Sequence, residues 1–352
     1  MTTIHEDVQV YYGETLQGTD DLQTNACCTL APPPPHIRRA LKRVADEVKD
    51  KYYGCGLTIP EAVGGLRVLD LGSGSGRDCY IAAQLVGERG EVIGVDMTPA
   101  QLDVANRYVE HHRAAFGYAR SNVSFVQGNI EQLDTLGLEA GSFDLIISNC
   151  VVNLAEDKAK VLRDVYALLK PGGELYFSDV YSDRRVPASL RADQLLWNEC
   201  LSGALYWNDF LNLARQAGFT DPRAVENKPI TVNNAALSER LGDIAFHSVT
   251  YRLFKLDGLE SDCEDYGQAV AYRGSIDTVP HGFVLDDHHY FPTGKILPVC
   301  GNTYRMLHDT RFRDAFDFYG TWDTHHGIFE GCGGAAPFSV GPANATDAAS
   351  CC

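Results

Sequence analysis

The chain has 352 residues, of which 45% are hydrophobic and 22% are charged, and its formal net charge is −17 at pH 7. This composition is typical of a globular protein, and the length favours two modest cores over one large core. The negative charge repels phosphate backbones and anionic lipids, so nucleic acid and membranes are unfavourable partners. The amino terminus is acidic and no run of about 18 apolar residues occurs, so we expect no secretory signal, no membrane span and a cytoplasmic location.

The sequence contains eleven cysteines, which is an odd number and a high count for an intracellular chain. In a reducing compartment most of them stay as thiols. The cysteines therefore indicate metal, metalloid or redox chemistry and not a disulfide scaffold.

Residues 1–60 predict an arm that contains one helix and precedes the first domain. Cys27 and Cys28 lie before the run Pro32–Pro35, which cannot form the interior of a helix and predicts an extended spacer. Apolar residues at helical spacing over 37–48 predict the helix. We expect this arm to fold over the ligand crevice of the domain that follows.

The stretch LRVLDLGSGSGRDCY, residues 66–80, predicts the first part of a nucleoside-binding unit. A short apolar strand passes through three closely spaced glycines into a helix over 77–86, so free N–H groups and a tight turn face one crevice. A second strand, 91–96, ends in an acid about 20 residues beyond the last glycine, where such folds place a carboxylate on ribose hydroxyls.

Strands and helices continue to alternate up to about residue 222, and this rhythm predicts a mainly parallel α/β sheet covered on both faces. Thr98-Pro99-Ala100-Gln101 has the pattern of a capping box at the start of one helix. The other expected strands are 123–126, 145–148 and 175–178, and the expected helices are 98–112, 157–169, 190–206, which carries Cys200, and 208–217.

Beyond residue 222 the pattern changes, and residues 223–320 predict a smaller α+β domain. Strands are expected over 225–232, 247–256, 268–276 and 290–299, followed by a terminal helix over 303–318. The tail, 321–352, is poor in core residues and is expected to be flexible.

The order of motifs resembles that of the S-adenosylmethionine (SAM)-dependent methyltransferases of the Rossmann-like class. Their first motif matches Asp70, Gly72, Gly74 and Gly76, their second Asp96, their fourth Phe143–Asn149, and the turn before their fifth strand Leu168–Gly173. The resemblance implies a doubly wound Rossmann-like sheet over 61–222 that binds SAM. It implies further SAM contacts from Met97, Asn129, Ile130 and Asn149.

Four cysteine contexts resemble segments of the arsenite methyltransferases. These contexts surround Cys27, Cys55, Cys150 and Cys200, in segments such as YYGCG, SNCVVNL and WNECLSGAL, and the resemblance extends from about Tyr11 to the region of residue 318. It implies that Cys150 and Cys200, with Cys55, hold trivalent arsenic, and that an arsenic-binding insertion lies near 180–206. It also implies that Cys27 and Cys55 form a redox pair, although the adjacent Cys28 leaves open which thiol of 27 and 28 acts.

The chemistry agrees with this resemblance. Trivalent arsenic is thiophilic, so thiolates are its expected ligands, and arsenite or methylarsenite is expected to arrive as a thiol adduct. Its lone pair can attack the SAM methyl group without a general base, so positioning and desolvation supply the rate. Methylation oxidises the arsenic, and a dithiol reopened by thioredoxin or glutathione can reduce it again.

Two alternatives remain open on the sequence. One is a methyltransferase of the same fold with a small organic acceptor and ordinary core thiols, and the other is a metalloid-binding protein without turnover. Cys79, Cys263 and Cys300 are expected to be structural, whereas Cys332, Cys351 and Cys352 either capture metalloid or are dispensable. Adjacent histidines point in different directions, so the pairs 288–289 and 325–326 predict no zinc site.

Overall fold

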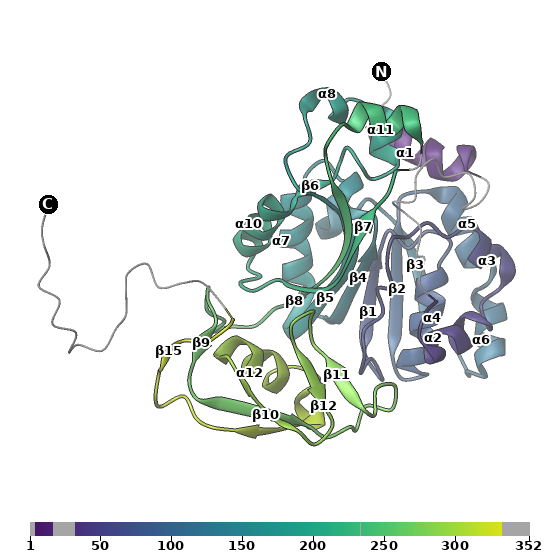
Figure 1. Ribbon diagram of the computed structural model, residues 1–352. Helices are drawn as coiled ribbons and strands as arrows, with labels where there is room; N and C mark the ends of the chain where they lie inside the picture. The colour runs from purple at the N-terminus through teal and green to yellow at the C-terminus, as the bar shows by residue number, and fades with distance from the viewer. Residues whose placement is uncertain (1–3, 17–31, 233, 333–352) are drawn as a thin grey trace, which may run out of the picture.

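The computed structural model describes residues 4–16, 32–232 and 234–332 (Figure 1). Cys27, Cys28, Cys351, Cys352 and most of the expected tail lie outside these ranges. Within them, every helix is too short or too polar to cross a lipid bilayer.

The core of the molecule is a sheet with the strand order β3-β2-β1-β4-β5-β8-β7, and the short β6 pairs with β5 (Figure 1). Strands β1 to β5 are parallel, and β8 runs antiparallel to both of its neighbours. The strands are β1 (Arg67–Leu71), β2 (Glu91–Asp96), β3 (Val123–Gln127), β4 (Phe143–Asn149), β5 (Leu169–Ser182), β6 (Leu205–Tyr206), β7 (Arg223–Ile230) and β8 (Phe246–Phe254). The predicted doubly wound α/β fold is confirmed.

Helices cover both faces of this sheet because successive strand residues point to opposite sides. In β1, Val68 packs toward α2, α3, α4 and α5, whereas Leu69 packs toward α7 and α10. The helices are α2 (Pro35–Leu41), α3 (Asp46–Asp50), α4 (Arg77–Val86), α5 (Pro99–Arg107), α6 (Val109–Phe116), α7 (Lys158–Leu168), α8 (Ala188–Arg191), α9 (Gln194–Asn198), α10 (Trp207–Ala217) and α11 (Ala235–Leu241). Both layers leave the carboxyl ends of β1, β2 and β4 at one edge.

The sequence analysis assigned two strands beyond residue 222 to the wrong domain. The two strands assigned to the second domain, β7 and β8, complete the main sheet, and β8 pairs with β5 over nine residue pairs from Glu174↔Phe254 to Ser182↔Phe246. They join as antiparallel neighbours and need no crossover helix, so the alternation that marks parallel strands is missing from their sequence.

Three expected helices are shorter than the sequence pattern suggested. The helix over 37–48 is broken between α2 and α3, and the terminal helix over 303–318 ends as α12 at His308, after which residues 316–319 form a strand. The helix over 190–206 ends as α9 at Asn198, and Cys200 lies in the turn that follows, with φ of 62°. Apolar periodicity continues through these breaks because the turns are buried as well.

A C-terminal module packs beside the sheet at the end opposite α1 (Figure 1). Its elements are β9 (Glu264–Asp265), β10 (Gln268–Tyr272), β11 (Gly282–Val284), β12 (Tyr290–Pro292), β13 (Ile296–Val299), α12 (Gly301–His308), β14 (Phe316–Tyr319) and β15 (Gly327–Ile328). Aromatic residues dominate its separate core, among them Tyr272, Phe283 and Phe316.

Buried ion pairs join this module to the main sheet. The carboxylate of Glu174 on β5 lies 2.5 Å from Arg252 Nε of β8 and 2.5 Å from Arg311 Nη1, which follows α12. Glu174 and Arg252 are fully buried. Arg252 also donates to the carbonyl of Leu285 at 2.9 Å. Glu174 therefore pairs with two cations where the module meets the sheet, and Glu61 lies 3.6 Å from one of them, Arg252.

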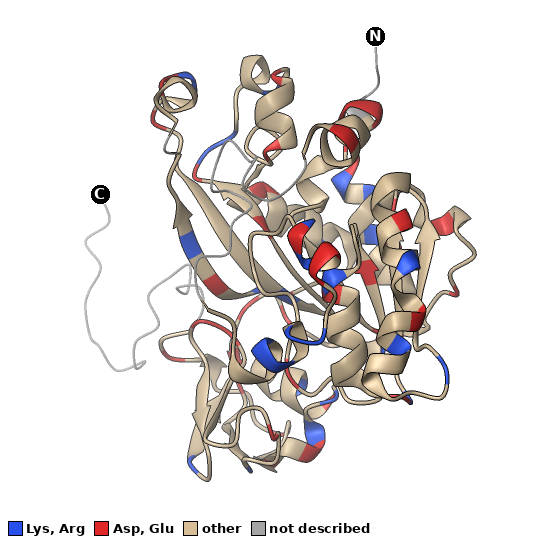
Figure 2. Ribbon diagram, turned by 90° about the vertical axis from the view of Figure 1, so that its right-hand side faces the viewer, with Lys and Arg blue, Asp and Glu red and all other residues tan. Residues whose placement is uncertain are grey.

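Acidic and basic residues are interspersed on the side formed by α2 to α6 (Figure 2). Several of them form exposed ion pairs, such as Arg107 with Glu47 and Arg113 with Glu110. Exposed pairs of this kind contribute little to stability.

The buried His112 of α6 makes the stability depend on pH. Its Nδ1 bonds the carbonyl of Tyr108 at 2.9 Å and its Nε2 accepts from the N–H of Ala45 at 3.1 Å, so a second ring proton would face a donor. Burial lowers the pKa of His112 from 6.5 to about 4. The unfolded chain therefore binds more protons between these values, and stability is lost as pH falls from 6.5 toward 4.

We expect the free energy of unfolding to fall by at most about 3 kcal/mol over this range on account of His112. Urea titrations at several pH values measure it. The variant His112→Gln should flatten the slope, while His111→Gln, which changes the exposed neighbour, should keep it. An equal slope in all three proteins contradicts the assignment.

Candidate functional site

The three glycines between β1 and α4 have positive φ angles, and each serves a different contact. A Cβ at Gly72, with φ of 68°, would lie 2.3 Å from the Val151 side chain, and one at Gly76, with φ of 87°, would lie 2.6 Å from Phe125. A Cβ at Gly74 would enter open space, with only Gln101 at 4.0 Å. Gly72 and Gly76 thus permit close packing, and Gly74 leaves the backbone exposed to a ligand.

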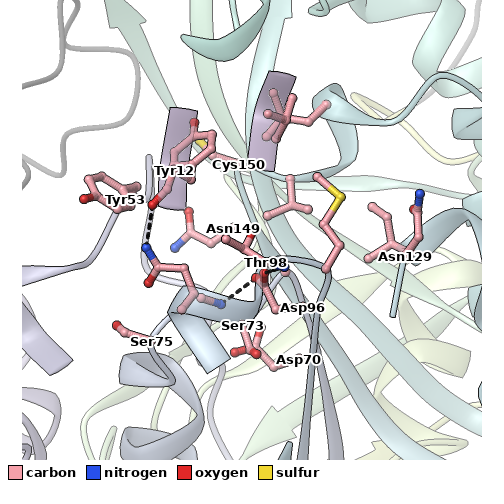
Figure 3. Close-up of a pocket in the computed structure, with 18 of the residues that line it drawn as sticks. Tyr12, Tyr53, Asp70, Ser73, Ser75, Asp96, Thr98, Asn129, Asn149 and Cys150 are labelled. Atoms are coloured by element: carbon pink, nitrogen blue, oxygen red, sulfur yellow. Dashed lines mark hydrogen bonds between the residues drawn. The ribbon is translucent and has the colours of Figure 1, made fainter. Parts of the chain in front are cut away.

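A cavity opens above this loop at the carboxyl ends of β1, β2 and β4 (Figure 3). Eight of the nine residues expected to bind the cofactor line it, namely Asp70, Gly72, Gly74, Asp96, Met97, Asn129, Ile130 and Asn149. The ninth, Gly76, is buried beneath Phe125 as the N-cap residue of α4. The position agrees with the crevice that open α/β sheets use for nucleotides.

Asp96 lies at the end of β2 and holds the loop in shape. Its two carboxylate oxygens accept from the N–H groups of Gly74 and Thr98, each at 2.8 Å. Burial raises the pKa of Asp96, and the two N–H groups act against this rise. Burial, followed by the charge of Asp78, raises the pKa of Asp70 well above its usual value, and Asp70 accepts a hydrogen bond from the Cys79 thiol.

The capping box predicted at Thr98 is only partly correct. Thr98 is the N-cap residue of α5 and Pro99 its first residue, but the Thr98 side chain makes no capping hydrogen bond. Gln101 instead donates from Nε2 to the carbonyl of Tyr12 at 2.8 Å, as Figure 3 shows. The side chain is used to hold a distant segment and not its own helix.

That segment, part of the arm expected over the ligand crevice, forms a wall of the cavity, and its lining residues were not among the predicted site residues. Residues 4–16 form α1 (Ile4–Val10) and a short π-helix, η1 (Tyr11–Thr15), and His5, Val8 and Tyr12 line the cavity. Gln9 donates to the carbonyl of Met97 at 2.8 Å. The spacing 5, 8, 12 places these residues on one face of a helix, and this pattern in the sequence could have indicated a helix that packs against the domain.

The same segment reaches the turn that carries Cys200. Tyr11 donates its hydroxyl proton to Glu199 at 2.6 Å, and Tyr12 donates to the carbonyl of Asn198 at 2.8 Å. The cofactor cavity and the Cys200 turn therefore share a wall.

Three cysteines meet beside the cavity, in the cluster that contains its lining residue Cys150. Cys55 and Cys150 form a disulfide with Cα atoms 5.9 Å apart, and the Sγ of Cys200 lies 3.4 Å from the carbonyl oxygen of Cys150. All three are buried in one apolar cluster with Val180, Leu196 and Leu201. Cys150 also lines the cavity (Figure 3). Cys27, the other expected redox thiol, lies outside the described residues.

Cys150 and Cys200 both have left-handed backbones, with φ of 56° and 62°. A residue with a Cβ is strained in this region, and such strain is concentrated at functional sites. Polar contacts hold the backbone of Cys55 beside them: Asn149 accepts from the N–H of Cys55 at 2.9 Å, and Ser248 of β8 donates to the carbonyl of Cys55 at 2.9 Å.

Two buried charges lie beside the cysteines. Lys158 donates to the carbonyl of Ala155 at 2.6 Å, and burial lowers its pKa to about 8, with Cys200 among the groups that act on it. Burial raises the pKa of Asp179 to about 7, against the hydrogen bond that it accepts from the N–H of Asn153.

Asp96→Asn is expected to raise the dissociation constant for SAM roughly 10- to 100-fold. The amide loses the charge that strengthens hydrogen bonds to hydroxyl groups, and its NH2 group faces the N–H of Gly74 or Thr98, which loses its acceptor. Isothermal titration calorimetry measures the change, with Asp103→Asn on the exposed face of α5 as the matched control. Unchanged affinity in Asp96→Asn contradicts the assignment of this carboxylate to the cofactor.

The loop, the acid that ends β2 and the cavity above them define a SAM-dependent methyltransferase of the Rossmann-like class. The family model described as a methyltransferase domain matches residues 62–218, and a domain of unknown function (DUF8838) matches residues 259–324.

Comparisons with individual proteins narrow this class. An arsenite methyltransferase of Aquipseudomonas alcaligenes is 59% identical over 349 residues, covering 99% of this chain and 100% of that protein. The arsenite methyltransferase of Homo sapiens is 46% identical over 316 residues, covering 89% and 83%. The crystal structure of an arsenic(III) S-adenosylmethionine methyltransferase from Chlamydomonas reinhardtii superposes with a TM-score of 0.82, at 53% identity over 85% of this chain and 100% of that one. The chain belongs to the arsenite methyltransferase family.

Proposed function

We propose that this chain methylates trivalent arsenic held by Cys150, Cys200 and Cys55, with SAM as the methyl donor. The observation that carries the proposal is the meeting of these three cysteines, from distant parts of the sequence, in one buried cluster whose member Cys150 lines the nucleoside cavity. Arsenite and methylarsenite are the substrates, delivered as thiol adducts.

The cavity fits the donor. Asp96 offers a carboxylate at the end of β2 for ribose hydroxyls, and the open backbone at Gly74 lets a ligand approach the loop closely. When bound, SAM supplies a methyl group on a positively charged sulfur. Asn129 and Ile130, which follow β3, line the part of the cavity that we assign to the adenine ring.

The cysteines fit the acceptor. Thiolates replace the oxygen or thiol ligands of trivalent arsenic and leave a pyramidal atom with a free lone pair. The apolar cluster around Cys150 and Cys200 excludes water, and the strained turns fix the sulfur positions. The lone pair forms the As–C bond as the bond from methyl to the donor sulfur breaks, and the electron pair stays with that sulfur.

The transfer oxidises arsenic by two electrons, to the pentavalent state. Two thiolates that close to a disulfide return these electrons, and the structure has a disulfide between Cys55 and Cys150. This oxidised form lacks two of the three proposed ligands, so a dithiol reductant such as thioredoxin, or glutathione, must open it before the next arsenic atom binds. We propose that Cys27 or Cys28 exchanges with Cys55 in this step.

Incubation with SAM, arsenite and a thiol, followed by separation of the arsenic species, tests the proposal. We expect methylated arsenic in amounts that match the S-adenosylhomocysteine formed. In the reduced protein, arsenite should protect Cys150 and Cys200 from alkylation. Binding of arsenite without methyl transfer would favour a metalloid-binding protein. Methyl transfer to an organic acceptor, with no protection of Cys150 and Cys200 by arsenite, would favour a methyltransferase with a small organic acceptor.

A further inference from the structure

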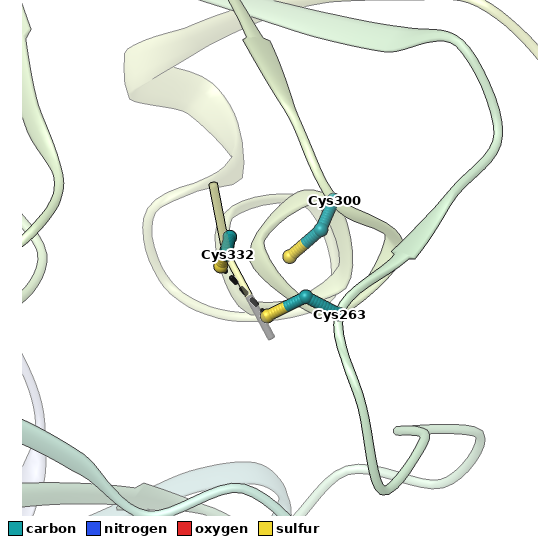
Figure 4. Close-up of side chains that lie close together, drawn as sticks. All are labelled: Cys263, Cys300 and Cys332. Atoms are coloured by element: carbon teal, nitrogen blue, oxygen red, sulfur yellow. Dashed lines mark hydrogen bonds between the residues drawn. The ribbon is translucent and has the colours of Figure 1, made fainter. Parts of the chain in front are cut away.

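A second group of three cysteines lies in the C-terminal module. The sulfur atoms of Cys263, Cys300 and Cys332 are all within 4.8 Å of one another, and those of Cys263 and Cys332 are 2.7 Å apart (Figure 4). Cys300 is buried and the other two are half-buried. They come from three segments: the residue before β9, the N-cap of α12, and the chain after β15.

One histidine faces the same group. The Nε2 of His289 lies 3.5 Å from Thr303 Oγ1, which is itself 3.3 Å from Cys300 Sγ. The other ring nitrogen, Nδ1, is 2.7 Å from the buried carboxylate of Asp286. Of the sequence pair 288–289, only His289 turns inward, and His288 is exposed.

We propose that Cys263, Cys300, Cys332 and His289 form a zinc site. Three thiolates and one imidazole are a standard donor set for a closed structural zinc ion. A carboxylate on the far nitrogen of the histidine, as Asp286 provides, fixes the ring and leaves Nε2 free for the metal. On binding, each thiol gives up its proton and becomes a thiolate ligand.

The geometry needs only a small adjustment. Tetrahedral zinc with bonds of about 2.3 Å to sulfur places its sulfur ligands roughly 3.8 Å apart. The three sulfur atoms already lie within that scale, with Cys263 and Cys332 about 1 Å too close to each other, and His289, which lies outside the group within 4.8 Å, must move toward the sulfurs. Trivalent arsenic would use the three sulfurs and leave His289 without a role, because its lone pair occupies the fourth direction.

The position gives the zinc ion a structural task. It would connect the β9–β15 pair, the start of α12 and the turn before β12. Arg223 of β7 lies 3.9 Å from Cys300 Sγ and 3.1 Å from Asp286, so a strand of the main sheet faces the site. The ion therefore holds the module in shape where it meets the sheet, apart from the nucleoside cavity.

Metal analysis of the full-length chain, purified under reducing conditions without a histidine tag, tests the site. We expect about one zinc per chain, and cobalt substitution should give the absorption of tetrahedral cobalt with thiolate charge-transfer bands. Cys300→Ser should lose both signals. The variant Cys351→Ser/Cys352→Ser removes two thiols that are not among the proposed ligands, and it should keep both the zinc content and the cobalt spectrum. Asp286→Asn should weaken zinc binding roughly 10- to 100-fold while retaining the cobalt spectrum.

Peptide mapping of the same protein without reduction gives a second measurement, which does not depend on how a variant folds. A Cys263–Cys332 disulfide in wild-type protein that takes up no cobalt after reduction overturns the proposal. The proposal is also overturned if wild-type protein binds arsenite at this site and excludes zinc, or if the variant Cys351→Ser/Cys352→Ser no longer binds zinc.

Discussion

Replacing either Cys150 or Cys200 with serine is expected to lower methylation of both arsenite and methylarsenite by at least about 10³-fold, or roughly 4 kcal/mol of transition-state stabilisation. The two residues occupy strained turns in one apolar cluster, and serine offers arsenic a hard, protonated oxygen in place of a soft thiolate. Product analysis at saturating SAM measures the loss for each substrate.

The matched control is Cys79→Ser. This thiol is buried in the same domain but does not line the cavity, and serine retains the hydrogen bond to Asp70. Its rates should be close to wild type. Cys55→Ser and Cys27→Ser should spare methylarsenite more than arsenite, because their proposed roles include the redox step. Equal losses in all four variants would remove this division of roles.

Glu174→Gln is expected to lower the free energy of unfolding by about 3–5 kcal/mol, because it leaves two buried guanidinium groups without their shared anion. Arg252 is fully buried, and Arg311 is held on the other carboxylate oxygen. The loss should appear in denaturant titration and should include the contact between the C-terminal module and the main sheet.

Glu91→Gln provides the comparison on an exposed pair. Arg67 Nε lies 2.6 Å from Glu91, but both side chains are open to water, so the change should be below about 1 kcal/mol. If Glu174→Gln and Glu91→Gln lower the free energy of unfolding by the same amount, burial does not explain the contribution of Glu174 to stability.

Local chemistry made the donor site predictable. Gly72, Gly74 and Asp96 lie within one strand-turn-helix-strand unit, where spacing in the sequence fixes spacing in the fold, and the cavity contains all three. The alternation of apolar runs with amphipathic helices predicted the mainly parallel sheet covered on both faces. The resemblance of the cysteine contexts then identified the acceptor residues, and Cys55, Cys150 and Cys200 do come together.

Contacts between distant segments were the part that the sequence did not reveal. Nothing near Gln101 shows that its amide reaches Tyr12, and nothing in β8 shows that it pairs beside β5, because antiparallel neighbours carry no crossover signal. Cys200 was placed on a helix because apolar periodicity continues through its turn. The group around Cys263 depends on three segments that meet only in the folded module.

The amino-terminal segment has a further consequence for the catalytic cycle. Its helix closes one side of the donor cavity, while Tyr11 and Tyr12 grip the residues immediately before Cys200. If residues 4–16 move away from the cavity so that S-adenosylhomocysteine is exchanged for SAM, the hydrogen bonds of Tyr11 and Tyr12 to Glu199 and Asn198 must break as well. In that case one movement opens the cofactor cavity and frees the turn that carries Cys200, so exchange of the nucleoside and release of the methylated arsenic occur together.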